Sequence, residues 1–245
     1  MKKVSISAVS YTNSKAFVFG LENSNIIEKI DLQKDIPADC AEKLINNKVD
    51  IGLIPIATLP LVPNGEIIGQ YCIGSDGAVN SVFLFSDLPL DEIKTIRLDA
   101  HSRTSNNLTK VLFHFYLKRP ITYLTPDDSY TKEDAHVLIG DRTFGKTKQF
   151  KTVLDLGQLW KDFTGLPFVY AAWVANKKLN PEFITEFNDA LKMGLDNLDN
   201  VIAQLKPIPD FNYKDYFYHN LKFNLDESKR EAIVLFLNRI ENLPK

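Results

Sequence analysis

The chain has 245 residues, of which 44% are hydrophobic and 24% are charged. Its 29 Lys and Arg residues stand against 31 Asp and Glu residues, and a formal net charge of -2 without blocks of like charge argues against a nucleic-acid partner. A chain of this length can bury roughly 70 to 75% of its extended surface, in one large domain or in two lobes.

Targeting and metal signals are missing from the pattern. The first residues, MKKVSISAVSY, lack an apolar run followed by a cleavage site, and no stretch approaches the roughly 20 apolar residues of a membrane span. We therefore expect a cytoplasmic protein that does not engage membranes. Cys40 and Cys72 lack CxxC spacing and a nearby His, so we expect two buried free thiols and no metal site.

Strands and helices are expected to alternate through the first two thirds of the chain. The hydrophobic pattern predicts strands at 4–9, 49–57, 78–86 and 136–141 and a short apolar strand beginning near Lys94, and the strand at 49–57 is apolar enough for a buried parallel strand. Helices are expected from 12, from 35 to 47 with Pro37 in the first turn, and from the hydroxyl-rich loop at 102–106 to Lys118. A short helix from 155 should stop at Gly165 and return as a strand at 167–174.

Helices dominate the pattern after Asn180. Asn180 and Pro181 fit the N-cap and first position of a long helix, and Asp226 should begin a final one. Because no Pro/Gly/Ser linker interrupts the chain, we expect two lobes joined by strands near 80–86 and 167–174. The expected division is 1–84 for the first part of lobe I, 85–169 for an inserted lobe II, and 170–245 for the return of lobe I.

The loop before the helix at 103–118 has the pattern of an anion site. Ser102, Thr104, Ser105 and Asn106 crowd a helix start, where backbone N–H groups lack intrahelical partners and the helix dipole favours negative charge by about 0.3 to 2 kcal/mol. Ordinary capping needs only one such residue. We therefore expect these four residues to contact an anionic ligand, with capping as the alternative.

Other polar residues follow or precede predicted strands, where ligands of open α/β sheets bind. Asn13, Ser14 and Asp141 are such candidates, and a helix or turn cap is the alternative for each. Ser81, within the strand expected at 78–86, is a further candidate, with a satisfied hydroxyl in a strand as its alternative. Among the histidines only His101 lies near the anion loop, either as a solvated residue or as a ligand contact. The sequence contains no P-loop, no GxGxxG and no Ser/His/Asp order with a nucleophile elbow.

Six segments in chain order share a pattern with a known family: YTNS (11–14), VDIGLIPIA (49–57), DGAVNSV (76–82), LDAHSRTSNNLTKVLF (98–113), LIGDRTF (138–144) and DLGQLWKDFTGLPFVYAAW (155–173). They resemble chorismate dehydratase, the first enzyme of the futalosine route to menaquinone. The resemblance implies an α/β periplasmic-binding-protein type II fold, with two lobes, mixed sheets, helices on both faces and a ligand cleft between the lobes. The related dihydroxynaphthoate synthase has a histidine base where this chain has Gly140. One departure is YTNSKAF, since the family pattern continues with an Arg-Pro or Lys-Pro pair.

The implied reaction converts chorismate to 3-[(1-carboxyvinyl)oxy]benzoate and water, without a cofactor. On this hypothesis Thr104 and Ser105 bind one carboxylate of the dianion, and Asn13 and Ser81 contact the other carboxylate or the departing hydroxyl. The remaining substrate contacts are expected from Ser14, Ser102, Asn106 and Asp141. Three candidates for the base that removes the ring proton stay open: the substrate's own enolpyruvyl carboxylate, Asp141 and His101. The alternatives are a dihydroxynaphthoate-synthase-like lyase and a non-catalytic small-acid binding protein; a monomer and a dimer are both compatible with the sequence.

Overall fold

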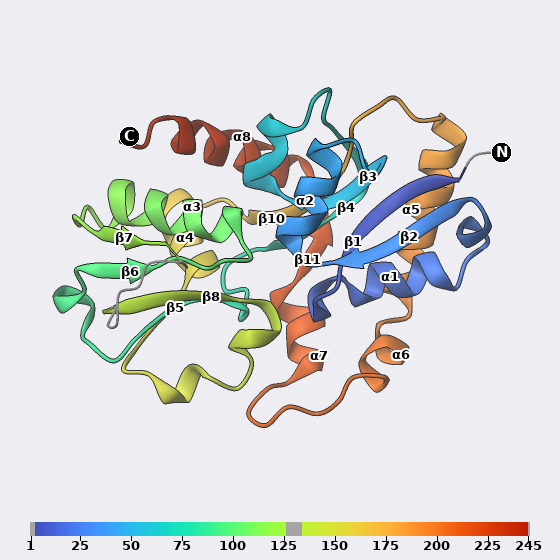
Figure 1. Ribbon diagram of the computed structural model, residues 1–245. Coiled ribbons are helices and arrows are strands. Elements are labelled where there is room, and N and C mark those ends of the chain that lie inside the picture. Colours follow the sequence, from blue (N-terminus) through green and yellow to red (C-terminus); the bar gives the residue numbers. More distant parts are fainter. Residues whose placement is uncertain (1–2, 126–133, 245) are drawn as a thin grey trace. The chain divides into compact units, whose positions relative to one another are not determined.

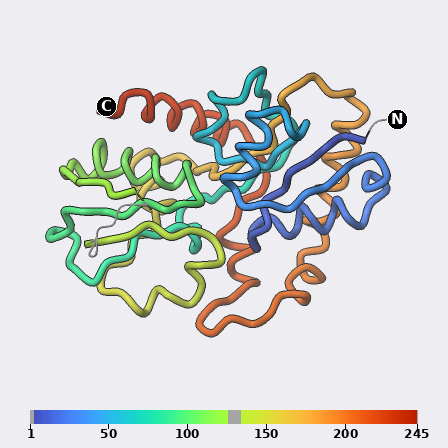
Figure 2. The backbone as a smooth tube through the Cα atoms, in the orientation of Figure 1, coloured from blue at the N-terminus to red at the C-terminus, as the bar shows by residue number. Residues whose placement is uncertain are grey.

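The computed structural model describes residues 3–125 and 134–244. The chain divides into two compact units by its internal contacts. Unit 1 contains the chain up to Ile73, Tyr170–Lys206 and Phe223–Leu225, and unit 2 contains Gly74–Val169, Pro207–Lys222 and the chain from Asp226. Figure 2 follows the backbone through these segments. Each unit is therefore assembled from segments that are far apart in sequence.

A mixed sheet forms the centre of unit 1 (Figure 1). In the described residues its order is β11-β4-β10-β3-β1-β2, where β1 is parallel to β2 and β3, and β10 is antiparallel to β3. The strands are β1 (Val4–Val9), β2 (Ile30–Asp35), β3 (Ile51–Pro55), β4 (Glu66–Ser75), β10 (Phe168–Ala175) and β11 (Lys222–Asn224). Every residue of β3 and β10 is buried, which explains their continuous apolar sequences.

The α-helices of unit 1 in the described residues are α1 (Lys15–Glu22), α2 (Pro37–Ile45), α5 (Pro181–Asp196) and α6 (Leu198–Ala203). Helix α1 packs closely on α5 because glycines stand at the crossing. A Cβ on Gly194 would lie 1.8 Å from the carbonyl oxygen of Ala16, and one on Gly20 would lie 1.9 Å from that of Ala190. The two backbones can approach this far only without side chains at these positions.

Unit 2 has a second mixed sheet, with the order β7-β6-β8-β5-β9 in the described residues. Its strands are β5 (Val82–Ser86), β6 (Thr95–Arg97), β7 (Thr122–Leu124), β8 (Ala135–Ile139) and β9 (Thr152–Asp155). Strand β6 is parallel to β7 and β8, and β5 is antiparallel to β8 and β9. The helices are α3 (Arg103–Val111), which continues as a π-helical turn (Leu112–Tyr116), α4 (Leu156–Thr164), α7 (Tyr213–Asp215) and α8 (Glu227–Glu241).

Local signals in the sequence located most helix ends correctly. The side chains of Asn180 and Asp226 accept hydrogen bonds from the N–H groups of Glu182 and Lys229, as N-caps do. Gly165 ends α4 in the left-handed conformation, with φ of 73°. The strand expected at 78–86 begins only at Val82, because residues 78–81 form a loop held by side-chain contacts.

The observed units differ from the division expected at 1–84, 85–169 and 170–245. The first segment of unit 1 ends at Ile73, and the chain beyond Asp226 belongs to unit 2 instead of returning to lobe I. The reason is the packing of α8: the Phe236 ring lies 4.9 Å from that of Phe168 and 5.8 Å from that of Trp160. These edge-on aromatic contacts bury the face of α8 that carries Ala232, Ile233 and Phe236 in the core of unit 2.

The structure also describes the state of the two cysteines and the lengths of the helices. Cys40 and Cys72 are free and buried, as predicted. In the described part of the chain, no helix is both long and apolar enough to cross a membrane.

Candidate functional site

One edge of the sheet of unit 2 gathers most of the candidate residues. The carboxyl ends of β6, β8 and β9 and the amino end of β5 meet there, as the pairings of Val82 with Ile139 and of Phe83 with Asp155 show. Loops at this edge carry Ser81, the residues 98–106 and the turn 140–143. The topology therefore brings the hydroxyl-rich loop, Ser81 and Asp141 to the same edge.

Asn106 fixes the loop before α3. Its Oδ1 accepts from the N–H of Asp99 and its Nδ2 donates to the carbonyl of Asp99, both at 2.8 Å. Because both the oxygen and the nitrogen of its side-chain amide are used in this way, Asn106 holds the loop in place. The substrate contact expected of it stays a prediction that nothing in this geometry supports.

Ser102 caps α3, and its side chain is hydrogen-bonded to Ser105. The Oγ of Ser102 accepts from the N–H of Ser105 at 3.0 Å and donates to the Oγ of Ser105 at 2.9 Å. Ser105 thus receives a hydrogen bond, and in the described residues its hydroxyl makes no hydrogen bond in which it is the donor. Thr104, buried in the first helical turn, stands between them. The capping alternative holds for Ser102, whereas Ser105 keeps a donor for a ligand.

An ion pair with a buried carboxylate joins the loop before α3 to the turn after β8. The Nη2 of Arg142 lies 2.7 Å from Oδ1 and 2.6 Å from Oδ2 of Asp99, whose side chain is fully buried. The N–H of His101 also donates to Asp99 Oδ1. Sequence reasoning missed this pair; the available signal was one charge in each of two loops that follow predicted strands.

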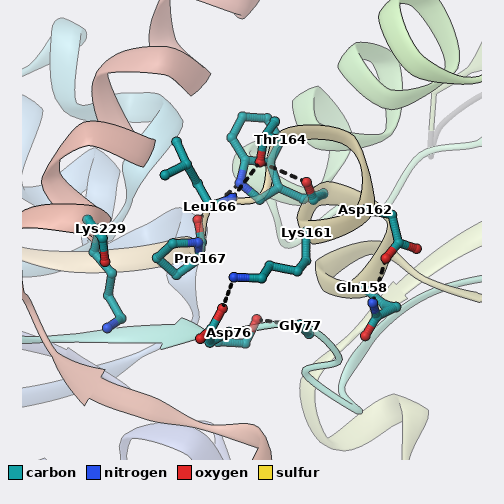
Figure 3. Close-up of polar contacts among 12 residues, drawn as sticks. Asp76, Gly77, Gln158, Lys161, Asp162, Thr164, Leu166, Pro167 and Lys229 are labelled. Atoms are coloured by element: carbon teal, nitrogen blue, oxygen red, sulfur yellow. Dashed lines mark hydrogen bonds and ion pairs between the residues drawn. The ribbon is translucent and has the colours of Figure 1, made fainter.

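The loop 76–80, which precedes Ser81, is held by side chains of α4 and of its N-cap, Asp155 (Figure 3). Lys161 forms an ion pair with Asp76 at 2.6 Å, and Gln158 accepts from the N–H of Ala78 at 3.2 Å. Asp155 accepts from the N–H groups of Val79 and Asn80, and also caps α4 by accepting from Gly157 and Gln158. Burial raises the pKa of Asp155, while the backbone donors oppose that shift.

Ser81 is buried, and its hydroxyl contacts Tyr216. The hydroxyl of Tyr216 donates to Ser81 Oγ at 2.9 Å, and the N–H of Gly140 donates to the carbonyl of Ser81 at 2.8 Å. Asp141 follows Gly140 in the same turn. Burial is the main cause that raises the pKa of Tyr213, and the charge of Asp141 adds to that rise. Burial also raises the pKa of Tyr216 and the charge of Asp141 adds to this rise, so Asp141 lies within electrostatic range of this hydroxyl pair. Sequence reasoning gave no signal for Tyr216.

Asn13 and Ser14 belong to unit 1, in the turn after β1. The Ser14 hydroxyl is fully buried and donates to the carbonyls of Val9 and Tyr11, so it closes this turn, and the substrate contact expected of it stays a prediction. The Oδ1 of Asn13 is buried and, in the described residues, has no hydrogen-bond donor. Buried amide oxygens are rarely left unpaired, so Asn13 remains a candidate for a ligand contact.

The TGLP segment (164–167), prominent in the resemblance, forms the turn between α4 and β10. Thr164 Oγ1 accepts from the N–H of Leu166 at 3.1 Å, and the Trp160 indole donates to the carbonyl of Pro167 at 3.0 Å. Figure 3 shows this turn beside the Lys161–Asp76 pair. The segment acts by holding α4, and thereby the loop before Ser81.

Solved structures share this fold. Protein AF1704 from Archaeoglobus fulgidus aligns over 98% of this chain and 97% of its own, with a TM-score of 0.74 and 15% identity. The Candida albicans CA3427 gene product, described as having the generic periplasmic binding protein fold, gives 0.66 at 13% identity over 98% and 90%. The alkanesulfonate-binding protein SsuA from Xanthomonas axonopodis pv. citri gives 0.63 at 12% identity over 100% and 95%. The fold is therefore that of the periplasmic-binding-protein-like class, as expected.

A family model described as menaquinone biosynthesis matches residues 4–242, which is nearly the whole chain. The protein belongs to this menaquinone biosynthesis family, and the relationship inferred from the six sequence segments is confirmed.

Proposed function

We propose that this protein is a hydro-lyase that converts chorismate to 3-[(1-carboxyvinyl)oxy]benzoate and water. The ring loses the proton on C3 and the hydroxyl on C4, and these leave together as one water while the ring becomes aromatic. Because aromatisation supplies the driving force, the protein needs only to hold a dianion, orient it and assist proton transfer. Membership in a menaquinone biosynthesis family supports an enzyme of this pathway.

The observation that carries the proposal is the pair Ser81 and Ser105. Each hydroxyl accepts a hydrogen bond from a neighbour, and neither has an acceptor for its own proton in the described residues. Two donors at one edge of the sheet of unit 2, beside the start of α3, suit an anion that brings its own acceptor oxygens. Ser105 is assigned to a carboxylate, with Thr104 beside it in the first turn of α3.

Ser81 and Asn13 are assigned to the other carboxylate or to the C4 hydroxyl. Asn13 offers a buried Oδ1 without a donor in the described residues, which a substrate hydroxyl can satisfy. The proton on C3 is taken by the enolpyruvyl carboxylate of the substrate, whose basicity rises when water is excluded. Asp141 and His101 are the protein bases to test: near-normal turnover after replacement of both supports the substrate-assisted route, and complete loss contradicts it.

Purified protein incubated with chorismate tests the reaction class. Mass spectrometry should detect a product lighter by one water, and unchanged chorismate would contradict a hydro-lyase acting on chorismate. Binding without turnover would favour a small-acid binding protein, and turnover of a later pathway intermediate would favour the dihydroxynaphthoate-synthase-like alternative. The cytoplasmic location stays a prediction of the sequence.

Ser105→Ala tests the carboxylate assignment. We expect about 5- to 30-fold weaker chorismate binding by calorimetry, because a hydrogen bond to a charged group is lost. Ser86→Ala is the matched control: Ser86 is a buried serine in β5 whose proton is already donated to the carbonyl of Asp134. Equal affinity in Ser105→Ala and wild type would contradict the assignment.

A further inference from the structure

Tyr216 has a hydroxyl that the proposed function does not use. The residue is fully buried, and its ring is surrounded by those of Phe144, Phe211 and Phe217 at centroid distances of 5.3, 5.3 and 5.7 Å. In the described residues, Ser81 Oγ is the hydrogen-bond partner of the Tyr216 hydroxyl, at 2.9 Å. A buried tyrosine hydroxyl needs an acceptor, so Tyr216 donates and Ser81 accepts.

The direction of this hydrogen bond decides where the Ser81 proton goes. A serine hydroxyl has one proton and two acceptor lone pairs. When Tyr216 occupies a lone pair, the Ser81 proton must point away from Tyr216, toward some other acceptor. In the described residues no such acceptor lies in reach, so the proton is available to a bound ligand.

The backbone of Ser81 is fixed on both sides, which leaves only the hydroxyl to be oriented. On one side Asn80, with φ of 57°, donates its N–H to Asp155 at 2.7 Å. On the other side the carbonyl of Ser81 accepts from Gly140 at 2.8 Å. Burial raises the pKa of Tyr216, and the charges of Asp141 and Asp155 add to this against the Ser81 hydrogen bond. The phenol therefore stays protonated as a donor.

We propose that Tyr216 is a positioning residue, which holds Ser81 Oγ as an acceptor so that the Ser81 O–H is directed at the acceptor oxygen of the anionic substrate. This role rests on the proposed function and on Ser81 in particular. Tyr216 does not touch the reacting atoms itself. It restricts the rotation of the Ser81 hydroxyl, which contacts the substrate.

A double-mutant cycle tests the role. In Tyr216→Phe, kcat for chorismate should fall about 10-fold while KM changes less than about twofold, because one oriented hydrogen bond is lost in the transition state. The same change made in Ser81→Ala should cost less than about twofold more, since the hydroxyl that Tyr216 orients is gone. Tyr218→Phe is the control, because Tyr218 lies in the same helical turn and is 46% exposed. The kcat of the Tyr218→Phe variant should equal that of wild type.

Two outcomes would overturn the inference. If Tyr216→Phe keeps the wild-type kcat, or loses the same factor with and without Ser81, then Tyr216 acts only through packing or not at all. Thermal unfolding of the four proteins of the cycle (wild type, both single variants and the double variant) and of the Tyr218→Phe control identifies a variant that fails to fold. If wild type does not dehydrate chorismate, the proposed function fails, and calorimetric affinity for chorismate is measured in the same four proteins. Non-additive losses of affinity then keep the positioning role, and additive or absent losses overturn it.

Discussion

Arg142 and Asp99 form a two-point ion pair, with Nη2 of the arginine 2.7 and 2.6 Å from the two carboxylate oxygens. The pair links the turn after β8, which carries Asp141, to the loop that leads into the first turn of α3, which carries Ser105. The Asp99 side chain has no exposed surface, whereas that of Arg142 is 36% exposed. Asp99 is therefore the partner that cannot be solvated if the other is removed.

Asp99→Asn should lower the free energy of unfolding by about 1 to 3 kcal/mol, because a charge-assisted contact is replaced by a weaker one and Arg142 loses its counterion. It should also raise KM for chorismate, because the start of α3 loses an anchor. Chemical denaturation and steady-state kinetics measure the two effects. Asp196→Asn, which breaks the exposed pair with Lys192, should change stability by less than about 0.5 kcal/mol. Equal effects of both substitutions would contradict this account.

Gly194→Ala should destabilise unit 1 severely. The new Cβ would lie 1.8 Å from the carbonyl oxygen of Ala16, so α1 and α5 must separate, at a cost of about 3 kcal/mol or more. Gly165→Ala is the contrast, because no atom lies within 4 Å of its Cβ and only the φ of 73° is unfavourable. We expect about 1 kcal/mol there. A smaller loss in Gly194→Ala than in Gly165→Ala, measured by denaturant unfolding, would show that the helices do not pack in this way.

Asp134 should make stability fall at low pH. The N–H groups of Lys94 and Thr95 donate to its Oδ2 at 2.8 and 2.9 Å and hold its pKa below the ordinary value of 3.8. A carboxyl whose folded pKa is lowered contributes stability above its unfolded pKa, and this contribution is lost as pH falls through the folded pKa. Asp134→Asn should therefore be less stable than wild type at pH 7 and lose less stability below pH of about 4. Parallel stability curves from acid titration would contradict the prediction.

Cys40 should be unreactive in the folded protein. Burial raises its pKa to about 12, so almost no thiolate is present at neutral pH. Labelling by a disulfide reagent at pH 8 should proceed no faster than unfolding, and both Cys40 and Cys72 should react at once in denaturant. Rapid labelling of native protein, followed by mapping of the modified residue, would show that one of these side chains is accessible.

Helix ends were predictable because the signals for them are local. The N-caps Asn180 and Asp226 and the C-terminal Gly165 each act within a few residues of themselves, so their pattern is complete in the sequence. Strands β2 and β4 were not predicted, because β2 mixes charged and apolar residues and β4 carries exposed polar positions. The place of α8 in unit 2 depends on Phe236 meeting Trp160 and Phe168, which is a long-range choice.

The sequence predicted where the residues of the candidate site lie, but not what each of them does. The four polar residues at 102–106 identified the start of α3, but spacing could not tell the cap Ser102 and the brace Asn106 from Ser105. Asp155 could be recognised as an N-cap, yet its second task, holding Val79 and Asn80, joins residues about 75 positions apart. Tyr216 lies further along the chain still, and only the fold brings it to Ser81.

Proton NMR of chorismate during incubation with wild-type protein and with Ser81→Ala tests the central claim most directly. The account predicts that wild type replaces the cyclohexadiene signals by those of a 3-substituted benzoate, and that Ser81→Ala does so much more slowly. Chorismate signals that stay unchanged with wild type, or that decay equally fast with Ser81→Ala, would contradict it.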